Sequence, residues 1–432
     1  RLILQDADQS FHPHLATSWE TSADGMQWTF KLRAGVKFHD GEPFNAKVIE
    51  WWVPKFKGQE NAYMVEAIDK VEVVDDLTFK LHMKNPDPNL LFNLASSFMG
   101  VPSPKSYDAL GDKFGVSAAI GTGPYKFVSW EPKGDLVLDR FDGYWGPKEP
   151  WAKHVRKEIA NDAARVAQLK AGQLDLITRV PATDVATLKR DPKIDVQIID
   201  TVYVFNIEMD LREKPVGVTA KDGSALAKNP FLDLKVREAI DMAIDRKALA
   251  EIAMEGLGKE VNQLVTPSIF GFNKSLPPRK YDPAAAKKLL AEAGYPAGFK
   301  FTFYFTKDRL PGDVQVGTSI AQMLAAIGID ATPSAQPVTV FFPARTRGEY
   351  SFSMSGWGTL TGEAHYTLSS LAHSNNPAVK MGAFNVLGYN NPEMDKALQA
   401  AAIEMDEAKR RKYLEDANAL VEKDRQRLPI VA

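Results

Sequence analysis

The sequence predicts an α/β protein with more than one domain, and three observations support this prediction. The chain has 432 residues, which is enough for two or three hydrophobic cores. Residues 1–40 show the two-residue alternation of β-strands, whereas from Lys153 onwards short strand patterns alternate with amphipathic helices. Residues 231–257 then add apolar side chains that recur at helical spacing. A β-rich first part followed by alternating helices and strands is typical of a mixed α/β fold.

The first hairpin lies in residues 19–41. Asp24-Gly25 is its predicted turn, because glycine adopts the positive φ that a chain reversal often needs. The strand after the turn alternates apolar and polar side chains, which predicts one buried face. Its apolar residues are Trp28, Phe30 and Leu32.

Residues 41–152 contain a second hairpin and a later strand. The second hairpin turns at Asp75-Asp76 between two short apolar alternations. A proline-rich stretch follows, and residues 121–127, GTGPYKF, indicate a loop that enters a strand. That strand is expected to run to the turn at residues 142–146.

Residues 153–229 are expected to alternate helices and strands and to end in a charged surface loop. Gly172 is the expected C-terminal cap of the first helix. The predicted elements are helices at 162–171 and 182–189, strands at 174–177 and 194–199, and a loop at 211–229.

From residue 230 onwards, helices predominate. Asp282 is a predicted helix cap with Pro283 in the first turn. The buried stripe of the first of these helices is expected to consist of Val236, Ala239, Ile240, Ala243, Ile244 and Ile252. The later predicted elements are strands at 299–305, 329–332 and 350–357, and helices at 283–294, 316–327, 391–402 and 406–423.

The composition excludes several classes of function. The chain has no cysteine, which excludes a thiol nucleophile, a cysteine zinc site and a disulfide scaffold. Its net charge is −2, so no basic field would attract nucleic acid. No apolar run is long enough to span a bilayer. Because the chain opens and closes inside strand-like segments, we interpret the sequence as trimmed at both ends, without its signal peptide.

The motifs of common enzyme classes are absent from the sequence. It contains no G-x-S-x-G elbow, no H-E-x-x-H helix and no Walker loop. Residues 121–124, GTGP, do not suit a phosphate loop, because Pro124 lacks a donor N–H and starts a strand. A pair of glycosidase carboxylates stays open, since sequence cannot measure the separation between two acids.

The stretch most suited to binding a small molecule is residues 353–370, SMSGWGTLTGEAHYTLSS. It places Trp357 among small and hydroxyl residues, followed by Glu363, His365 and Tyr366. An aromatic wall with a few polar groups is typical of a ligand cleft. The alternative is a glycine-rich connection in which Trp357 packs into the core, and residue types alone do not decide between the two.

Four phrases spread over the chain resemble one family, the large bacterial solute-binding proteins that deliver peptides, nickel and opines to ABC importers. These phrases are residues 19–41, 122–145, 236–246 and 389–395. The resemblance implies a two-lobed periplasmic-binding-protein fold of type II, with an extra β-rich subdomain and a hinge that includes residues 202–209. The implied division is lobe I at 1–40 and 153–229, the subdomain at 41–152, lobe II at 230–425, and a return strand toward lobe I at 426–432.

The resemblance also implies a binding function without catalysis or a cofactor. The expected function is capture of a small peptide, an opine or a related amino-acid or sugar derivative between the lobes, and its delivery to the membrane permease. The protein is expected to be monomeric and periplasmic, or anchored by a lipid to the outer face of the membrane. A nickel-chelate carrier of the same family is the alternative, and a glycoside hydrolase or peptidase is a remote one.

The candidate ligand-binding residues follow from the resemblance and from the stretch at 353–370. Peptide-binding members carry an aspartate about three residues after the tryptophan, where this chain has Leu360. Glu363 is the nearest carboxylate that could meet a ligand ammonium, and an uncompensated buried charge would be costly. Arg345 could bind a ligand carboxylate, whereas His365 is the histidine that a nickel chelate would use. The full set is Trp357, Gly358, Thr359, Thr361, Glu363, His365, Tyr366 and Arg345, and no resident metal site is predicted.

The phrase at residues 389–395 has a structural explanation as well. Asn391 can cap the helix that begins at Pro392, which accounts for both residues without a ligand. Tyr389 and Phe384 are the further aromatic candidates near the cleft.

Overall fold

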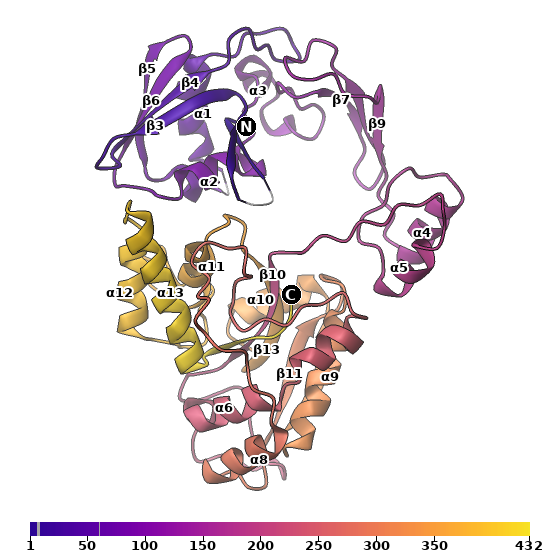
Figure 1. The fold of residues 1–432 in the computed structure, drawn as a ribbon, viewed down its shortest axis with the longest axis vertical. Helices are drawn as coiled ribbons and strands as arrows, with labels where there is room; N and C mark the ends of the chain where they lie inside the picture. Colours follow the sequence, from indigo (N-terminus) through magenta and orange to yellow (C-terminus); the bar gives the residue numbers. More distant parts are fainter. Residues whose placement is uncertain (7–8, 60) are drawn as a thin grey trace. The chain divides into compact units, whose positions relative to one another are not determined.

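The computed structural model describes residues 1–6, 9–59 and 61–432. The chain forms two compact units (Figure 1). Unit 1 comprises Arg1–Ala171 with Ile403–Asp406, and unit 2 comprises Gly172–Ala402 with Glu407–Ala432. The lobe and subdomain boundaries expected from the sequence stay predictions. No described helix is long and apolar enough to cross a membrane.

Unit 1 is organised around a four-stranded antiparallel sheet in the order β3-β4-β6-β5. Both predicted hairpins are confirmed, and Gly25 at the first turn has φ +70°. Trp28, Phe30 and Leu32 point into the core as their alternation predicts. The strands are β3 (Ala16–Thr21), β4 (Gln27–Leu32), β5 (Ile68–Asp75) and β6 (Thr78–Met83).

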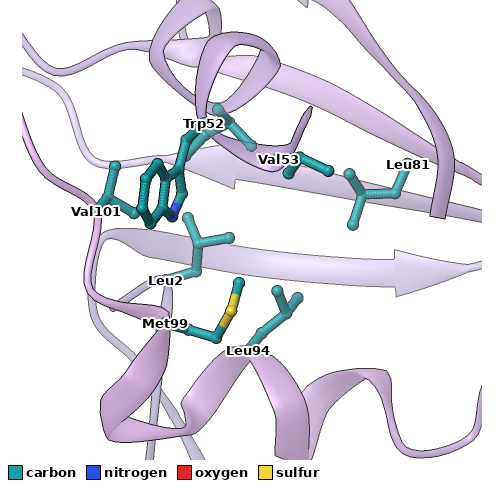
Figure 2. A pocket seen from close by; sticks show the side chains of 8 residues that line it. Leu2, Trp52, Val53, Leu81, Leu94, Met99 and Val101 are labelled. Atoms are coloured by element: carbon teal, nitrogen blue, oxygen red, sulfur yellow. The ribbon is translucent and has the colours of Figure 1, made fainter. Parts of the chain in front are cut away.

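Short helices and a small hairpin surround this sheet. Asn45 caps α1 by accepting a hydrogen bond from the Lys47 amide, and the apolar face of α1 is buried in the same core as β4. The elements are β1 (Ile3–Gln5), β2 (Phe11–Pro13), α1 (Ala46–Phe56), α2 (Leu90–Ala95) and α3 (Pro104–Leu110). One cavity in this core has a volume of about 10 Å³ and is lined by apolar side chains (Figure 2). It has space for about one water molecule and none for a peptide-sized solute.

The phrase H-D-G at residues 39–41 has a structural role in unit 1. His39 Nε2 donates to the carbonyl of Gly123 at 2.9 Å. The Asp40 carboxylate accepts hydrogen bonds from the hydroxyls of Ser103 and Ser106 at 2.6 and 2.7 Å. His39 thus joins the loop after the first hairpin to the G-T-G-P loop, and Asp40 joins it to the N-terminal end of α3. Both family-like phrases therefore stabilise the fold.

The remaining part of unit 1 is a three-stranded antiparallel sheet, β7-β8-β9, followed by α4. Their bounds are β7 (Tyr125–Trp130), β8 (Leu136–Arg140), β9 (Lys153–Arg156) and α4 (Asp162–Lys170). Helix α4 begins after the Asn161 cap and ends before Gly172, which has φ +70° as expected of a C-terminal cap.

The strands predicted at 174–177 and 194–199 are wrong. Neither segment forms a strand, whereas the helix predicted between them is present as α5 (Ala182–Leu188). The side chains of Leu176 and Ile199 are 76% and 81% exposed. A short apolar segment becomes a strand only when a neighbouring strand accepts its hydrogen bonds, and these two segments pair with none of the described strands.

Unit 2 is built on a five-stranded mixed sheet in the order β12-β11-β13-β10-β14 (Figure 1). Strands β11, β12 and β13 are parallel, and β10 is antiparallel to both β13 and β14. The strands are β10 (Tyr203–Met209), β11 (Lys300–Thr306), β12 (Asp330–Gln336), β13 (Phe352–Gly358) and β14 (Arg427–Pro429). Strands β11 and β13 begin and end within two residues of the strands predicted at 299–305 and 350–357, and β14 lies within the segment 426–432 that was expected to be a strand.

The two faces of this sheet differ in chemistry. One face carries Phe301, Phe303, Phe305, Phe352 and Met354, which are buried with the apolar residues of the helices. On the other face, strand pairing places Glu208 opposite Ser353, Asn206 opposite Ser355, and Val204 opposite Trp357. We call this second surface the polar face of the sheet.

The helices of unit 2 largely follow the prediction. Asp282 caps α8, and Gly328 with φ +98° ends the turn after α9. The helices include α6 (Leu234–Ala243), α7 (Arg246–Ala248), a π-helical turn (Leu249–Ala253), α8 (Pro283–Glu292), α9 (Asp313–Ala326) and α10 (Val338–Thr346). They continue with α11 (Ala364–Leu371), α12 (Pro392–Ala401) and α13 (Glu407–Asp424).

The predicted buried stripe of the first helix is correct except at Ile252. Helix α6 ends at Ala243 because Ile244 adopts an extended conformation, with φ −92° and ψ 113°. Asp245 then caps a new turn by accepting from the Ala248 amide. This break changes the helical phase, so Ile252 is 76% exposed.

Candidate functional site

The candidate site lies at the end of β13 in unit 2, where the sequence reads Gly356-Trp357-Gly358. Both glycines are closely packed against side chains of other segments. A Cβ atom at Gly356 would lie 2.1 Å from Leu310 Cδ1, and one at Gly358 would lie 2.7 Å from the ring of Tyr203. The carboxyl ends of the parallel strands in α/β sheets are the usual place for ligands. Trp357 is the penultimate residue of β13 and therefore lies at this edge.

Trp357 forms an aromatic cluster with two side chains from other segments. Its ring centroid is 5.6 Å from that of Tyr366 on α11 and 4.9 Å from that of Phe384, which it meets edge to face. Phe384 is 40% exposed, and Trp357 and Tyr366 are half-buried. We call these three residues the aromatic wall. Its partial exposure gives a ligand apolar surface to bind.

The connection from β13 to α11, residues 359–363, is anchored inside unit 2. The Thr359 amide donates to the Val202 carbonyl at 3.2 Å, and the Thr359 hydroxyl bonds to that of Thr367 at 2.9 Å. The Phe270 amide donates to the Gly362 carbonyl at 3.0 Å. Thr359 and Thr361 are buried, whereas Leu360 is 50% exposed. The loop therefore turns its hydroxyl groups inward.

Glu363 is paired within the same unit. Its side chain is fully buried, and Arg410 Nη2 on α13 lies 3.0 Å from its Oε2. The guanidinium of Arg410 also stands 5.1 Å from the ring centroid of Phe270. A buried carboxylate that is already neutralised by a guanidinium has little charge left for a ligand ammonium.

His365 lies on α11, and its ring is packed against α12. Its Nε2 is 3.2 Å from the carbonyl oxygen of Leu398 and donates to it. Burial lowers the pKa of His365 from 6.5 to about 4, although the bond to Leu398 opposes this shift and the charges of Arg410 and His373 add to it. Binding a metal through Nε2 would require this hydrogen bond to break. The described residues contain no cluster of three or more histidine and acidic side chains suited to a metal ion.

The lowered pKa of His365 predicts a loss of stability in mild acid. The folded state prefers the neutral imidazole, so the contribution is complete above pH 6.5 and is lost as the pH falls toward 4. Between pH 7 and pH 5 the loss should be about 2 kcal/mol. We expect His365→Gln, which can still donate to Leu398, to flatten the pH dependence of the urea unfolding midpoint. His154→Gln on exposed β9 serves as the control, and an unchanged slope for His365→Gln would contradict the assignment.

Arg345 is buried on the polar face of the sheet. Its side chain lies on α10 and forms a two-point ion pair with Glu208, with Nη2 2.7 Å from Oε2 and Nε bonded to Oε1. Arg427 Nη2 lies 2.7 Å from the same Oε2. Burial alone would raise the pKa of Glu208, but the two guanidiniums hold it at about 2. Arg345 therefore uses its Nε and Nη2 donors within the protein.

Arg309 is a candidate that sequence reasoning missed. It lies in the loop after β11, at the same edge of the sheet as Trp357, and its Nη1 donates to the Gly356 carbonyl at 2.8 Å. Its guanidinium stands 4.7 Å from the ring centroid of Phe342, and burial lowers the pKa of Arg309. The available signal was an arginine four residues after the carboxyl end of the strand predicted at 299–305.

The phrase at residues 389–395 has the structural role that its cap pattern predicts. Asn391 Oδ1 accepts from the amide of Glu393 at 2.9 Å and starts α12. The hydroxyl of Tyr389 donates to Asp424 Oδ2 at 2.6 Å, and Asn391 Nδ2 donates to the same oxygen at 2.7 Å. Tyr389 is thus buried and holds α12 to the end of α13.

The eight predicted site residues therefore fall into two groups. Trp357 and Tyr366 share the aromatic wall, with Gly358 directly after Trp357. Thr359, Thr361, Glu363 and Arg345 are buried, and His365 is bonded to a backbone carbonyl. Ligand contact by any of the eight stays a prediction, and the geometry ranks Trp357 and Tyr366 first.

Comparison with known proteins supplies the family context. Residues 10–378 match the model described as bacterial extracellular solute-binding proteins, family 5 middle. The chain is 29% identical over 424 residues to the glutathione-binding protein GsiB of Pectobacterium atrosepticum, covering 95% of this chain and 78% of GsiB. It is 29% identical over 454 residues to the heme-binding protein A of Haemophilus influenzae, with 97% and 78% covered.

Solved structures give the same result. The periplasmic binding protein DppA of Helicobacter pylori, in complex with the peptide STSA, superposes with a TM-score of 0.80 at 27% identity. The alignment covers 100% of this chain and 85% of DppA. The α/β fold predicted from the sequence is confirmed by this likeness.

Proposed function

Because this chain belongs to family 5 of the bacterial extracellular solute-binding proteins, we propose that it captures a carboxylate-bearing peptide, opine or related amino-acid or sugar derivative for an ABC importer. The resemblance inferred from four sequence phrases is confirmed. Its relatives are substrate-binding proteins of ABC transporters and not enzymes, which removes the hydrolase alternative. Family members are periplasmic, and we propose the same location for this protein. Anchoring by a lipid to the outer face of the membrane is the alternative.

The observation that carries this proposal is the aromatic wall with Arg309 at the same sheet edge. Trp357 and Tyr366 offer partly exposed ring surface to the apolar body of a solute. Arg309 has one nitrogen fixed to the Gly356 carbonyl, which orients the rest of its guanidinium. An oriented, half-buried guanidinium binds a carboxylate with geometric selectivity.

The proposed solute lacks a free α-ammonium group at this wall. Glu363, the nearest carboxylate after the tryptophan in sequence, is neutralised by Arg410, and Leu360 presents only an apolar side chain. Desolvating an ammonium without a counter-charge costs several kcal/mol. A solute whose amine is acylated carries no positive charge there and avoids that cost. The relative named for glutathione and the DppA complex with a peptide support the broader class of peptide-like solutes with carboxylates.

The proposed mechanism requires no chemistry on the solute. The bound solute favours a closed state of the lobes, because its affinity for that state is higher. The permease then recognises the closed state and receives the solute. The chain acts as a monomer in this scheme, with the permease as its protein partner.

A thermal-shift screen tests the proposal. The panel contains two matched sets of peptides, one with free or acetylated amines and one with acid or amide C-termini. It also contains reduced glutathione, opines, neutral oligosaccharides and nickel–histidine. A solute at 100 times its Kd should add about 2.7 kcal/mol of stability, which is an increase of several degrees in Tm. We expect the acids, and the blocked amines among them, to give this increase. Stabilisation by oligosaccharides or nickel–histidine alone would contradict the proposal, and so would hydrolysis of a bound peptide.

A further inference from the structure

The polar face of unit 2 contains a buried charge cluster whose contacts lead to the aromatic wall. Glu208 lies at its centre and is bonded to Arg345, Arg427 and the Ser353 hydroxyl, the last at 2.8 Å. Arg427 Nη1 also donates to Asn206 Oδ1 at 2.8 Å. All of these side chains are less than 6% exposed. The hydrogen bonds and ion pairs among these groups restrain them to one arrangement.

Phe384 connects this cluster to Trp357. Its carbonyl oxygen accepts hydrogen bonds from Arg345 Nη2 at 3.2 Å and from Arg427 Nη2 at 3.4 Å. The guanidinium carbon of Arg345 stands 6.0 Å from the centroid of the Phe384 ring. The same ring meets Trp357 edge to face at 4.9 Å. Phe384 therefore has its backbone bonded to the cluster and its ring against the wall.

The segment that carries Phe384 belongs to no helix or strand. Residues 372–391 form neither helix nor strand, and the Phe384 amide donates to the Ser370 carbonyl at 3.1 Å. A segment without ladder hydrogen bonds is held in place by its individual contacts. The Phe384 backbone forms two hydrogen bonds with the charge cluster and one with Ser370.

The balance of charge explains why a carbonyl is held there. Two guanidiniums share one carboxylate, so the cluster has one positive charge in excess among these three groups. A carbonyl oxygen that faces both guanidiniums offsets part of this excess, because its dipole points its negative end at them. The Phe384 carbonyl therefore has an electrostatic preference for this position.

Building on the proposed function, we propose that Arg345 is a positioning residue for solute binding. Through the Phe384 carbonyl and ring, it sets the orientation of the aromatic wall. Arg345 itself does not touch the solute in this scheme. This differs from the carboxylate-binding role expected from the sequence, because its Nε and Nη2 donors are already bonded to Glu208 and Phe384.

The test measures the environment of Trp357 directly and needs no solute. In each background, the emission of Trp357 is the difference between the protein and its Trp357→Phe variant. Arg345→Lys keeps the charge and loses the planar contacts to Glu208 and Phe384. We expect it to shift the Trp357 emission to the red and to increase its quenching by acrylamide, as Phe384→Ala should also do. The double variant Arg345→Lys/Phe384→Ala should match Phe384→Ala alone, because both changes act through one contact.

Arg246→Lys is the matched control. Arg246 is another buried arginine of unit 2, whose Nη2 lies 2.5 Å from Asp241 and which does not contact the wall residues. It should lower Tm and leave the Trp357 emission unchanged. If Arg345→Lys does not fold, Arg427→Lys replaces it with the same expectation. Parental Trp357 emission in either folded variant would overturn the inference, as would additive effects in the double variant. Failure of the solute screen alone would leave this result standing and would overturn the proposed function instead.

Discussion

Glu208→Ala is expected to lower the free energy of unfolding of unit 2 by about 3–5 kcal/mol. Glu208 is 3% exposed and is the carboxylate that both Arg345 and Arg427 bind. Removing it leaves two positive charges close together in a region of low dielectric, where neither can recover its hydration. The Ser353 hydroxyl loses its acceptor at the same time. The expected decrease in Tm is roughly 10 °C for a unit of this size.

Glu349→Ala provides the control for this prediction. Glu349 forms a two-point ion pair with Arg347, but both side chains are at least 50% exposed. Exposed pairs of this kind contribute at most about 1 kcal/mol, because water and salt screen them. Urea unfolding followed by circular dichroism distinguishes the two cases. A change of less than about 1 kcal/mol for Glu208→Ala would show that the two arginines are not held by its charge.

Local signals in the sequence predicted most of the fold. The caps at Asn391, Asp282 and Gly172 act through contacts within a few residues, so the local sequence is enough to predict them. The same holds for both hairpins of unit 1. The failures depend on distant partners. Residues 194–199 have a strand-like pattern but no described strand beside them, and Ile252 is displaced by a break at Ile244 that its own helix pattern does not reveal.

The candidate site was only partly accessible to sequence reasoning. Trp357 and Tyr366 could be selected because a large aromatic among small residues at a strand end is unusual. The direction in which the neighbouring polar side chains point could not be predicted. Glu363 and Thr359 turn inward because Arg410 and Thr367 lie there, and both partners come from later in the chain. Arg309 was missed for the same reason, since the Gly356 carbonyl that orients it is 47 residues away.

The family-like phrases are informative about fold and less so about the solute. His39 joins two loops of unit 1, Asp40 bonds to the N-terminal end of α3, and Tyr389 and Asn391 hold α12 to α13. These contacts are needed whatever the protein binds. Solute specificity then depends on the few side chains that remain partly exposed at the sheet edge. The sequence phrases therefore identify the family and do not identify the individual solute.

Trp357→Ala should weaken binding of the stabilising acid from the screen by about 30-fold or more, with little change in fold. A large aromatic that forms the centre of a contact surface typically contributes about 2 kcal/mol or more to binding. The half-buried ring of Trp357 packs on Tyr366 and Phe384 rather than inside the main core of unit 2, so its loss leaves that core intact. Isothermal titration at a temperature well below Tm measures the affinity.

Trp357→Phe and Phe352→Ala complete this experiment. The phenylalanine variant keeps an aromatic surface and should recover most of the affinity. Phe352 lies on the same strand, but its ring points to the apolar face and is fully buried, so its removal should cost about 3–5 kcal/mol of stability. If Trp357→Ala unfolds the protein as Phe352→Ala does, Trp357 belongs to the core. In that case the connection that follows Trp357 only links β13 to α11. The loss of binding in Trp357→Ala would then be explained by the loss of the fold and would give no evidence for contact with the solute.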